Sequence, residues 1–127
     1  MAHGTARIGR DHYRTEIAVG GHDLVADEGP GLGGQNAGPA PYDLLLASLG
    51  ACTAITLRMY ADRKDWPLES VAVGLRLSGG RDAMRIDRTL TIAGLDADQQ
   101  ARLADIAERT PVTLTLKAGL PIDTRLS

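Results

Sequence analysis

The first candidate for chemistry is Cys52, the only cysteine among the 127 residues. A cysteine can act as a nucleophile when its sulfur is ionised and reachable, since the thiolate is the reactive form. A lone cysteine in an apolar helix is more often a small, inert core residue. Taken alone, the residue leaves both interpretations open.

Other kinds of site find little support among the reactive side chains. The three histidines are scattered and cannot form a metal site with a single cysteine. No Ser-His-Asp ordering suggests a hydrolase, and the GGQNAG segment at 33–38 lacks the strand-loop-helix spacing of a phosphate-binding loop. We therefore predict no metal and no bound cofactor.

Length and composition predict one domain, residues 1–127, large enough for a real core. Charged residues make up 24% and the formal net charge is −2, which favours neither nucleic acid nor an anionic membrane as a partner. No intrachain disulfide can form, and no apolar leader follows Met1. The predicted compartment is the cytoplasm.

Cys52 belongs to the segment that dominates the sequence, residues 33–63, which read GGQNAGPAPYDLLLASLGACTAITLRMYADR. Pro39 and Pro41 are suited to a helix start, and Asp43 would meet the positive end of the helix dipole. Residues 44–59 are apolar nearly all round, so we expect this helix to be buried on most faces. Its hydroxyl side chains and short length argue against a membrane span.

Small residues form a strip on this helix at Ala47, Gly50, Ala51 and Ala54. Gly50 costs about 1 kcal/mol relative to alanine inside a helix, which close approach by another backbone would explain. The few strands of a 127-residue chain cannot cover such a helix on all sides. We predict an obligate homodimer that buries more than the ~2,000 Å² typical of permanent interfaces, with the small residues at or near the contact.

The remaining sequence predicts an α+β fold, with antiparallel sheets packed on the long central helix. Alternating apolar residues predict strands at 5–10, 13–19 and 22–27, a hairpin over 68–93, and a closing edge strand at 121–126. Residues 28–40 read as a loop too polar and glycine-rich for a regular element. Asp96 with Gln99 predicts a capping box, and Thr110 with Pro111 predicts the start of a further short helix.

The central motif resembles the signature of the OsmC/Ohr family, the osmotically induced and organic-hydroperoxide-resistance proteins. The resemblance extends to the strand order before it, the hairpin after it and the IAERTPV segment around Pro111, and so covers almost the whole chain. It implies an OsmC-like fold and an intertwined homodimer with two central helices packed together. It also implies active sites at the subunit interface, where a cysteine reduces hydroperoxides.

The resemblance also exposes a departure from the family pattern. Typical members carry a second cysteine at the start of the later helix, and that position is Thr110 here. In the family cycle, the helix thiolate becomes a sulfenic acid and the second thiol closes it to a disulfide. With Thr110 this closure is impossible within one chain, so a sulfenic acid at Cys52 would need an external thiol or dithiol.

The family activates its thiolate with an arginine from the first hairpin, held by a carboxylate near the start of the central helix. Gly9-Arg10-Asp11 resembles the family segment, so Arg10 is the candidate. The glutamate of the hydroperoxide-resistance branch would fall at Tyr42. At about 100° per residue, Asp43 lies roughly opposite Cys52, which favours a role for it at the helix start.

Two hypotheses follow for function. The first is a one-cysteine hydroperoxide reductase, an antioxidant enzyme of the oxidative stress response, with Cys52 and Arg10 as its catalytic residues. Its partners would be a second copy of the chain, a small hydroperoxide and an external thiol or dithiol. The alternative is a catalytically lapsed OsmC-like dimer that binds a small hydrophobic ligand.

Overall fold

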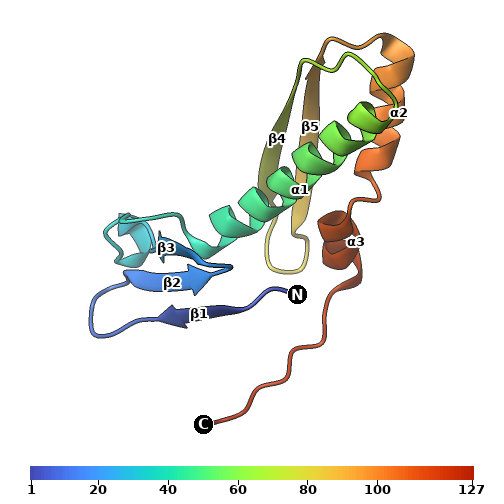
Figure 1. Ribbon diagram of the computed structural model, residues 1–127. Helices are drawn as coiled ribbons and strands as arrows, with labels where there is room; N and C mark the ends of the chain where they lie inside the picture. Colours follow the sequence, from blue (N-terminus) through green and yellow to red (C-terminus); the bar gives the residue numbers. More distant parts are fainter. The chain divides into compact units, whose positions relative to one another are not determined.

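The computed structural model describes residues 1–127, which form two compact units, 1–45 and 46–127. The first unit contains strands β1 (Gly4–Arg7), β2 (Thr15–Val19) and β3 (His22–Ala26) and the 3-10 turn η1 (Pro30–Leu32). The helix α1 (Pro41–Arg63) begins in the first unit and continues into the second (Figure 1). The second unit adds β4 (Ser70–Ser78), β5 (Arg85–Ala93), α2 (Ala97–Ala107) and α3 (Pro111–Ala118).

The first unit is a three-stranded antiparallel sheet in the order β1-β2-β3. Its predicted strands are confirmed, although β1 ends at Arg7 rather than at residue 10. The loop at 28–40 contains η1, so the prediction that it has no regular element is wrong for those three residues. Buried Asp27 organises this loop, because its carboxylate accepts backbone N–H groups from Glu28 at 2.7 Å and Ala37 at 3.1 Å.

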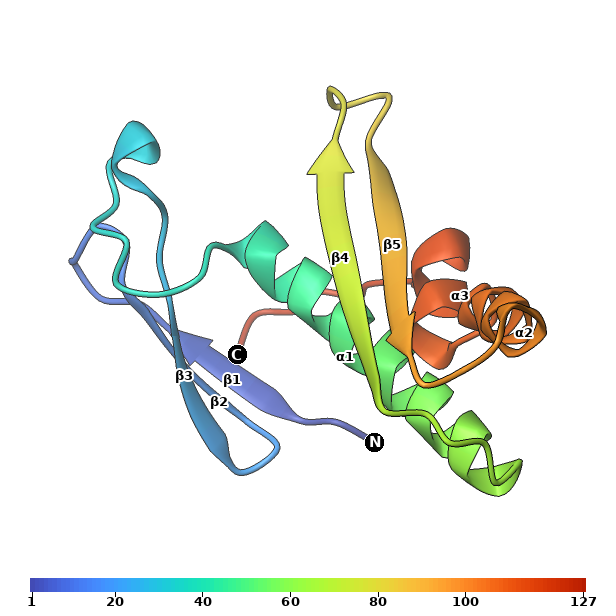
Figure 2. The same cartoon turned by 90° about the horizontal axis from the view of Figure 1, so that it is seen from above.

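The second unit is built on the predicted hairpin, in which β4 and β5 pair antiparallel from Ser70 with Ala93 to Ser78 with Arg85. Figure 2 shows the two strands side by side, with α2 and α3 beyond β5. The capping box of α2 is confirmed: Asp96 accepts from the Gln99 N–H at 2.8 Å, and Gln99 accepts in return at 3.1 Å. Apolar side chains of α1 and α2, with one from the segment before β4, form the core, namely Leu57, Ala61, Leu68, Leu103 and Ala107.

The predicted edge strand at 121–126 is wrong, because these residues form neither strand nor helix. A strand needs a neighbour to satisfy its backbone N–H and C=O groups. The two sheets of the chain contain only β1-β2-β3 and β4-β5. The α+β class is nevertheless confirmed.

Within one chain α1 is covered along one stripe only, which agrees with the prediction that the few strands of the chain cannot cover it on all sides. Its buried residues are Leu49, Thr53, Leu57 and Ala61, spaced four apart. The opposite side of the helix, two residues on from each buried position, is exposed and carries Ala47, Ala51, Ile55 and Met59. The helix therefore carries an uncovered apolar face.

The predicted helix start at Pro39 and Pro41 is confirmed, and α1 runs over 23 residues to Arg63. By length and composition alone its 23 residues could cross a membrane, with a mean hydropathy of 1.5 over the best window. The helix is thus not too short to span a membrane, contrary to the prediction. The core helix of a soluble protein meets the same criterion, so this finding by itself assigns no location.

Gly50 has one close neighbour within the chain. A Cβ on this residue would lie 2.9 Å from Cδ1 of Leu75 on β4. The glycine therefore leaves room for the Leu75 side chain. The expected approach of another backbone, across a dimer contact, stays a prediction. Of the four small residues, only Ala47 and Ala51 lie on the exposed face.

Candidate functional site around Cys52

Cys52 lies half-buried in the middle of α1, beside the buried stripe. The backbone N–H of Val112, in the first turn of α3, donates to its sulfur at 3.5 Å. The hydroxyl of Thr56, one turn further along α1, lies 4.0 Å from the same atom. The sulfur therefore faces the amino-terminal end of a second helix, the end that attracts negative charge.

The start of α3 follows the sequence prediction. Thr110 is the N-cap and its hydroxyl accepts from the N–H of Thr113 at 3.4 Å, while Pro111 takes the first helical position. Thr110 is fully buried, and its hydroxyl also lies 2.6 Å from that of Thr113. The position of the family's second cysteine is thus filled by a satisfied capping hydroxyl.

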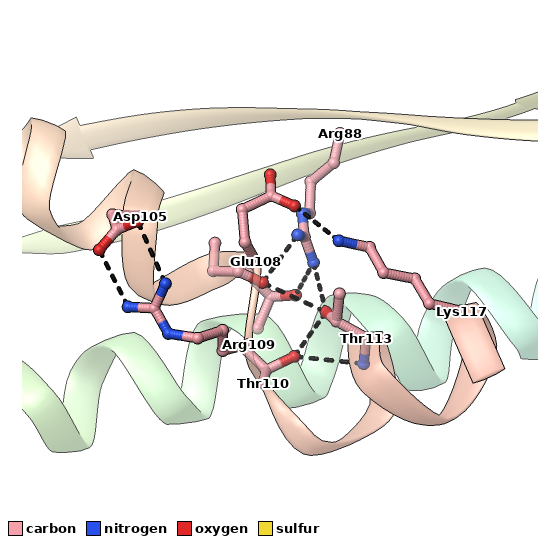
Figure 3. A network of polar contacts seen from close by, with 9 residues as sticks. Arg88, Asp105, Glu108, Arg109, Thr110, Thr113 and Lys117 are labelled. Carbon is pink, nitrogen blue, oxygen red and sulfur yellow. Dashed lines mark hydrogen bonds and ion pairs between the residues drawn. The ribbon is translucent and has the colours of Figure 1, made fainter.

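Arg88 joins the elements around the site. From β5 its Nη1 donates to the hydroxyls of Thr53 at 3.0 Å and Thr113 at 2.9 Å. Its Nη2 donates to the carbonyl oxygen of Ala107, at the end of α2, at 2.8 Å. One guanidinium therefore links α1, α2 and α3, in the network of Figure 3.

Two exposed ion pairs flank this network (Figure 3). Lys117 donates to Glu108 at 2.9 Å and joins the last turn of α3 to the end of α2. The hydrogen bond and charge of Lys117 lower the pKa of the Glu108 carboxyl, against the opposing effect of burial. Arg109 donates to both oxygens of Asp105 and lowers its pKa in the same way. Exposed pairs of this kind contribute little to stability.

Arg10 lies in the exposed loop between β1 and β2. It belongs to the first unit, and Cys52 belongs to the second. The pairing of Arg10 with Cys52 therefore stays a prediction.

The interpretation of Asp43 as a residue of the helix start agrees with its contact. Its carboxylate accepts the backbone N–H of Ala40 at 2.9 Å, which satisfies a group just before α1. Tyr42 is 57% exposed. Elsewhere, no three His, Cys, Asp or Glu side chains converge in a way that could hold a metal ion.

Arg88 was not among the predicted site residues, although the sequence contains a signal for it. In β5 the half-buried side chains alternate with exposed ones, and Arg88 falls in the series with Ile86, Leu90 and Ile92. A charge on the apolar face of a strand needs buried acceptors. That pattern predicts a buried polar contact, but it does not indicate which residues accept.

A sequence model of the OsmC-like protein family matches residues 33–125, so the chain belongs to this family. No curated protein matches the chain.

Solved structures share the fold at low sequence identity. An OsmC-like protein from Mycoplasma pneumoniae has a TM-score of 0.77 and 19% identity, over 92% of this chain and 87% of that one. An organic hydroperoxide resistance protein OsmC from Legionella pneumophila has a TM-score of 0.69 and 21% identity, over 92% and 89%. A proposed organic hydroperoxide resistance protein from Vibrio cholerae, with captopril bound in one of its active sites, has a TM-score of 0.75 and 18% identity, over 92% and 84%.

Proposed function

We propose that this protein is a cytoplasmic one-cysteine hydroperoxide reductase of the oxidative stress response. The observation that carries the proposal is the setting of Cys52, half-buried with its sulfur 3.5 Å from the Val112 nitrogen at the start of α3. An inert core cysteine would be enclosed by apolar side chains. Relatives named for organic hydroperoxide resistance support the same chemistry.

In the proposed reaction, the Cys52 thiolate attacks the terminal oxygen of a hydroperoxide. The O–O bond breaks and Cys52 becomes a sulfenic acid, while the leaving alkoxide takes up the proton that the thiol released and departs as the alcohol. Arg10 is proposed to stabilise the thiolate and to bind the peroxide oxygen. An external thiol or dithiol then returns the sulfur to the thiol, because Thr110 cannot form a disulfide.

Turnover of an organic hydroperoxide tests this function. Purified protein with cumene hydroperoxide and dithiothreitol should consume peroxide, and Cys52→Ser should reduce the rate to the uncatalysed background. Thr89→Ser, an exposed change on β5, is the matched control and should retain full activity. Equal, background rates in the parent and Cys52→Ser would contradict the reductase and favour the ligand-binding alternative.

We further propose that residues 1–127 form one OsmC-like domain of a homodimer. The support is the uncovered apolar face of α1, where Ile55 and Met59 are each 54% exposed and the small residues Ala47 and Ala51 allow a close approach. A second copy of the same helix would cover this face with self-complementary contacts.

Sedimentation velocity tests the dimer. The parent should sediment as a dimer at micromolar concentration, and Ile55→Glu should shift it to the monomer because the carboxylate would be buried without a partner. Thr89→Glu, with the same charge on the exposed face of β5, should leave the dimer intact. A parent protein that sediments as a stable monomer would refute the proposal.

A further inference from the structure

A backbone nitrogen from a second helix lies against the Cys52 sulfur. Val112 N lies 3.5 Å from Sγ, while the family's second thiol is replaced by the capping hydroxyl of Thr110. We propose that the sulfenic acid of Cys52 condenses with the backbone nitrogen of Val112 to form a sulfenamide. This inference rests on the proposed function, since the hydroperoxide supplies the oxidation.

The step balances without a further reactant. The nitrogen of Val112 forms a bond to Sγ, the S–O bond breaks, and the departing hydroxide takes the amide proton and leaves as water. An external thiol later attacks Sγ, so that the S–N bond breaks and the nitrogen regains a proton. A second thiol reduces the resulting mixed disulfide, and the sum is hydroperoxide plus two thiols to alcohol, water and a disulfide.

The Val112 N–H is available for this reaction because of its place in α3. It is the second residue of the helix, following Pro111 at the first position. The first four N–H groups of an α-helix have no partner within the helix. Loss of this proton therefore breaks no hydrogen bond of α3, only the contact to the sulfur.

The residues that follow the two reacting ones are held together. Thr53 follows Cys52 and Thr113 follows Val112, and both hydroxyls accept from the same Arg88 Nη1, at 3.0 and 2.9 Å. Thr53 is fully buried and Thr113 is 5% exposed. Arg88 thus acts as a positioning residue that keeps α1 and α3 in register across the new bond.

A sulfenamide would protect the only cysteine. A sulfenic acid that waits for an external thiol can be oxidised further to the irreversible sulfinic acid. Closure onto Val112 consumes the sulfenic acid on which this second oxidation acts. The backbone nitrogen would thus take over the protective role of the missing second cysteine.

Mass spectrometry tests the inference. The reduced protein is treated with about one equivalent of cumene hydroperoxide, without thiol. The expected product is a single chain about 2 Da lighter than the reduced protein, reversed by dithiothreitol. With one cysteine per chain, this loss cannot be an intrachain disulfide, and an interchain disulfide would double the mass. Trypsin should then release residues 110–117 joined to residues 15–58, with fragmentation placing the bond at Cys52 and Val112.

Two variants provide controls. Val112→Ala keeps the N–H and should keep the lighter product, whereas Val112→Pro lacks the N–H and should accumulate forms about 16 and 32 Da heavier. If Val112→Pro does not fold, the presence or absence of the joined peptides in the parent and in Val112→Ala still tests whether the sulfenamide forms.

The outcomes separate this inference from the function on which it rests. Heavier forms at Cys52 in the parent without joined peptides, or a lighter product in folded Val112→Pro, would overturn the sulfenamide and leave the reductase intact. A Cys52 that stays unmodified would overturn both.

Discussion

Replacing Arg88 with methionine should destabilise the protein far more than a surface arginine would. Arg88 donates three hydrogen bonds, to Thr53, Thr113 and Ala107, at 2.8–3.0 Å. Hydrogen bonds from a charged group contribute about 1.5–3 kcal/mol each. The contribution of each hydrogen bond should fall below this range here, because Arg88 is only half-buried and its acceptors keep other partners. At about 1 kcal/mol each, we expect a loss of about 3 kcal/mol, since methionine preserves the packing of the stem.

Urea unfolding at a fixed protein concentration measures this loss. Arg85→Met is the matched control, because Arg85 lies on the same strand and its side chain is 70% exposed in a pair with Asp87. That change should cost at most about 0.5 kcal/mol. If Arg88→Met and Arg85→Met differ by less than about 1 kcal/mol, Arg88 does not hold the helices as its contacts indicate.

Three further predictions concern other parts of the chain. Thr110→Cys should form an intrachain disulfide with Cys52 after hydroperoxide treatment, because Val112, two residues on, contacts the sulfur. If peptide mapping finds no disulfide, position 110 does not lie where the family's second cysteine closes the sulfenic acid. Arg10→Ala should slow alkylation of Cys52 at neutral pH several-fold with partial recovery in alkali, and identical pH profiles would leave Arg10 as a surface charge. Asp27→Asn should lower the melting temperature by several degrees at pH 7, because burial raises the pKa of Asp27 but backbone N–H groups outweigh it and hold the pKa below 3.8. Since the pKa of Asp27 is lower in the folded than in the unfolded protein, this stabilisation is present above pH 3.8 and is lost as the pH falls through the folded pKa. The melting temperatures of parent and variant should therefore converge in acid. A difference that stays constant with pH would refute the assignment.

The sequence predicted the parts of the fold that local chemistry determines. Alternation along 68–93 identifies the β4–β5 hairpin, and the residue types at Asp96 and Thr110 identify two helix starts. Each of these signals lies within a few residues of the feature that it predicts. The prediction of an edge strand at 121–126 was wrong because alternation alone does not supply the neighbouring strand that a β-strand requires.

The site depends on contacts between distant residues and was predicted only in part. Cys52 is recognisable as the single thiol in the central helix, but its contact with Val112 joins residues 60 positions apart. The three acceptors of Arg88 likewise come from three separate helices or their ends. A sequence pattern can place Arg88 on an apolar face, but only the folded chain brings its acceptors together.

The most direct test of the central claim is a single-turnover titration of the Cys52 thiol. Fully reduced protein is mixed with increasing cumene hydroperoxide in the absence of other thiols, and the remaining thiol is counted with a chromogenic disulfide reagent while peroxide loss is measured in parallel. The account predicts that one thiol per chain is lost for each hydroperoxide consumed, within seconds, and that dithiothreitol restores it. A Cys52 that still reacts fully with the reagent after excess hydroperoxide, with the peroxide unconsumed, would contradict the account.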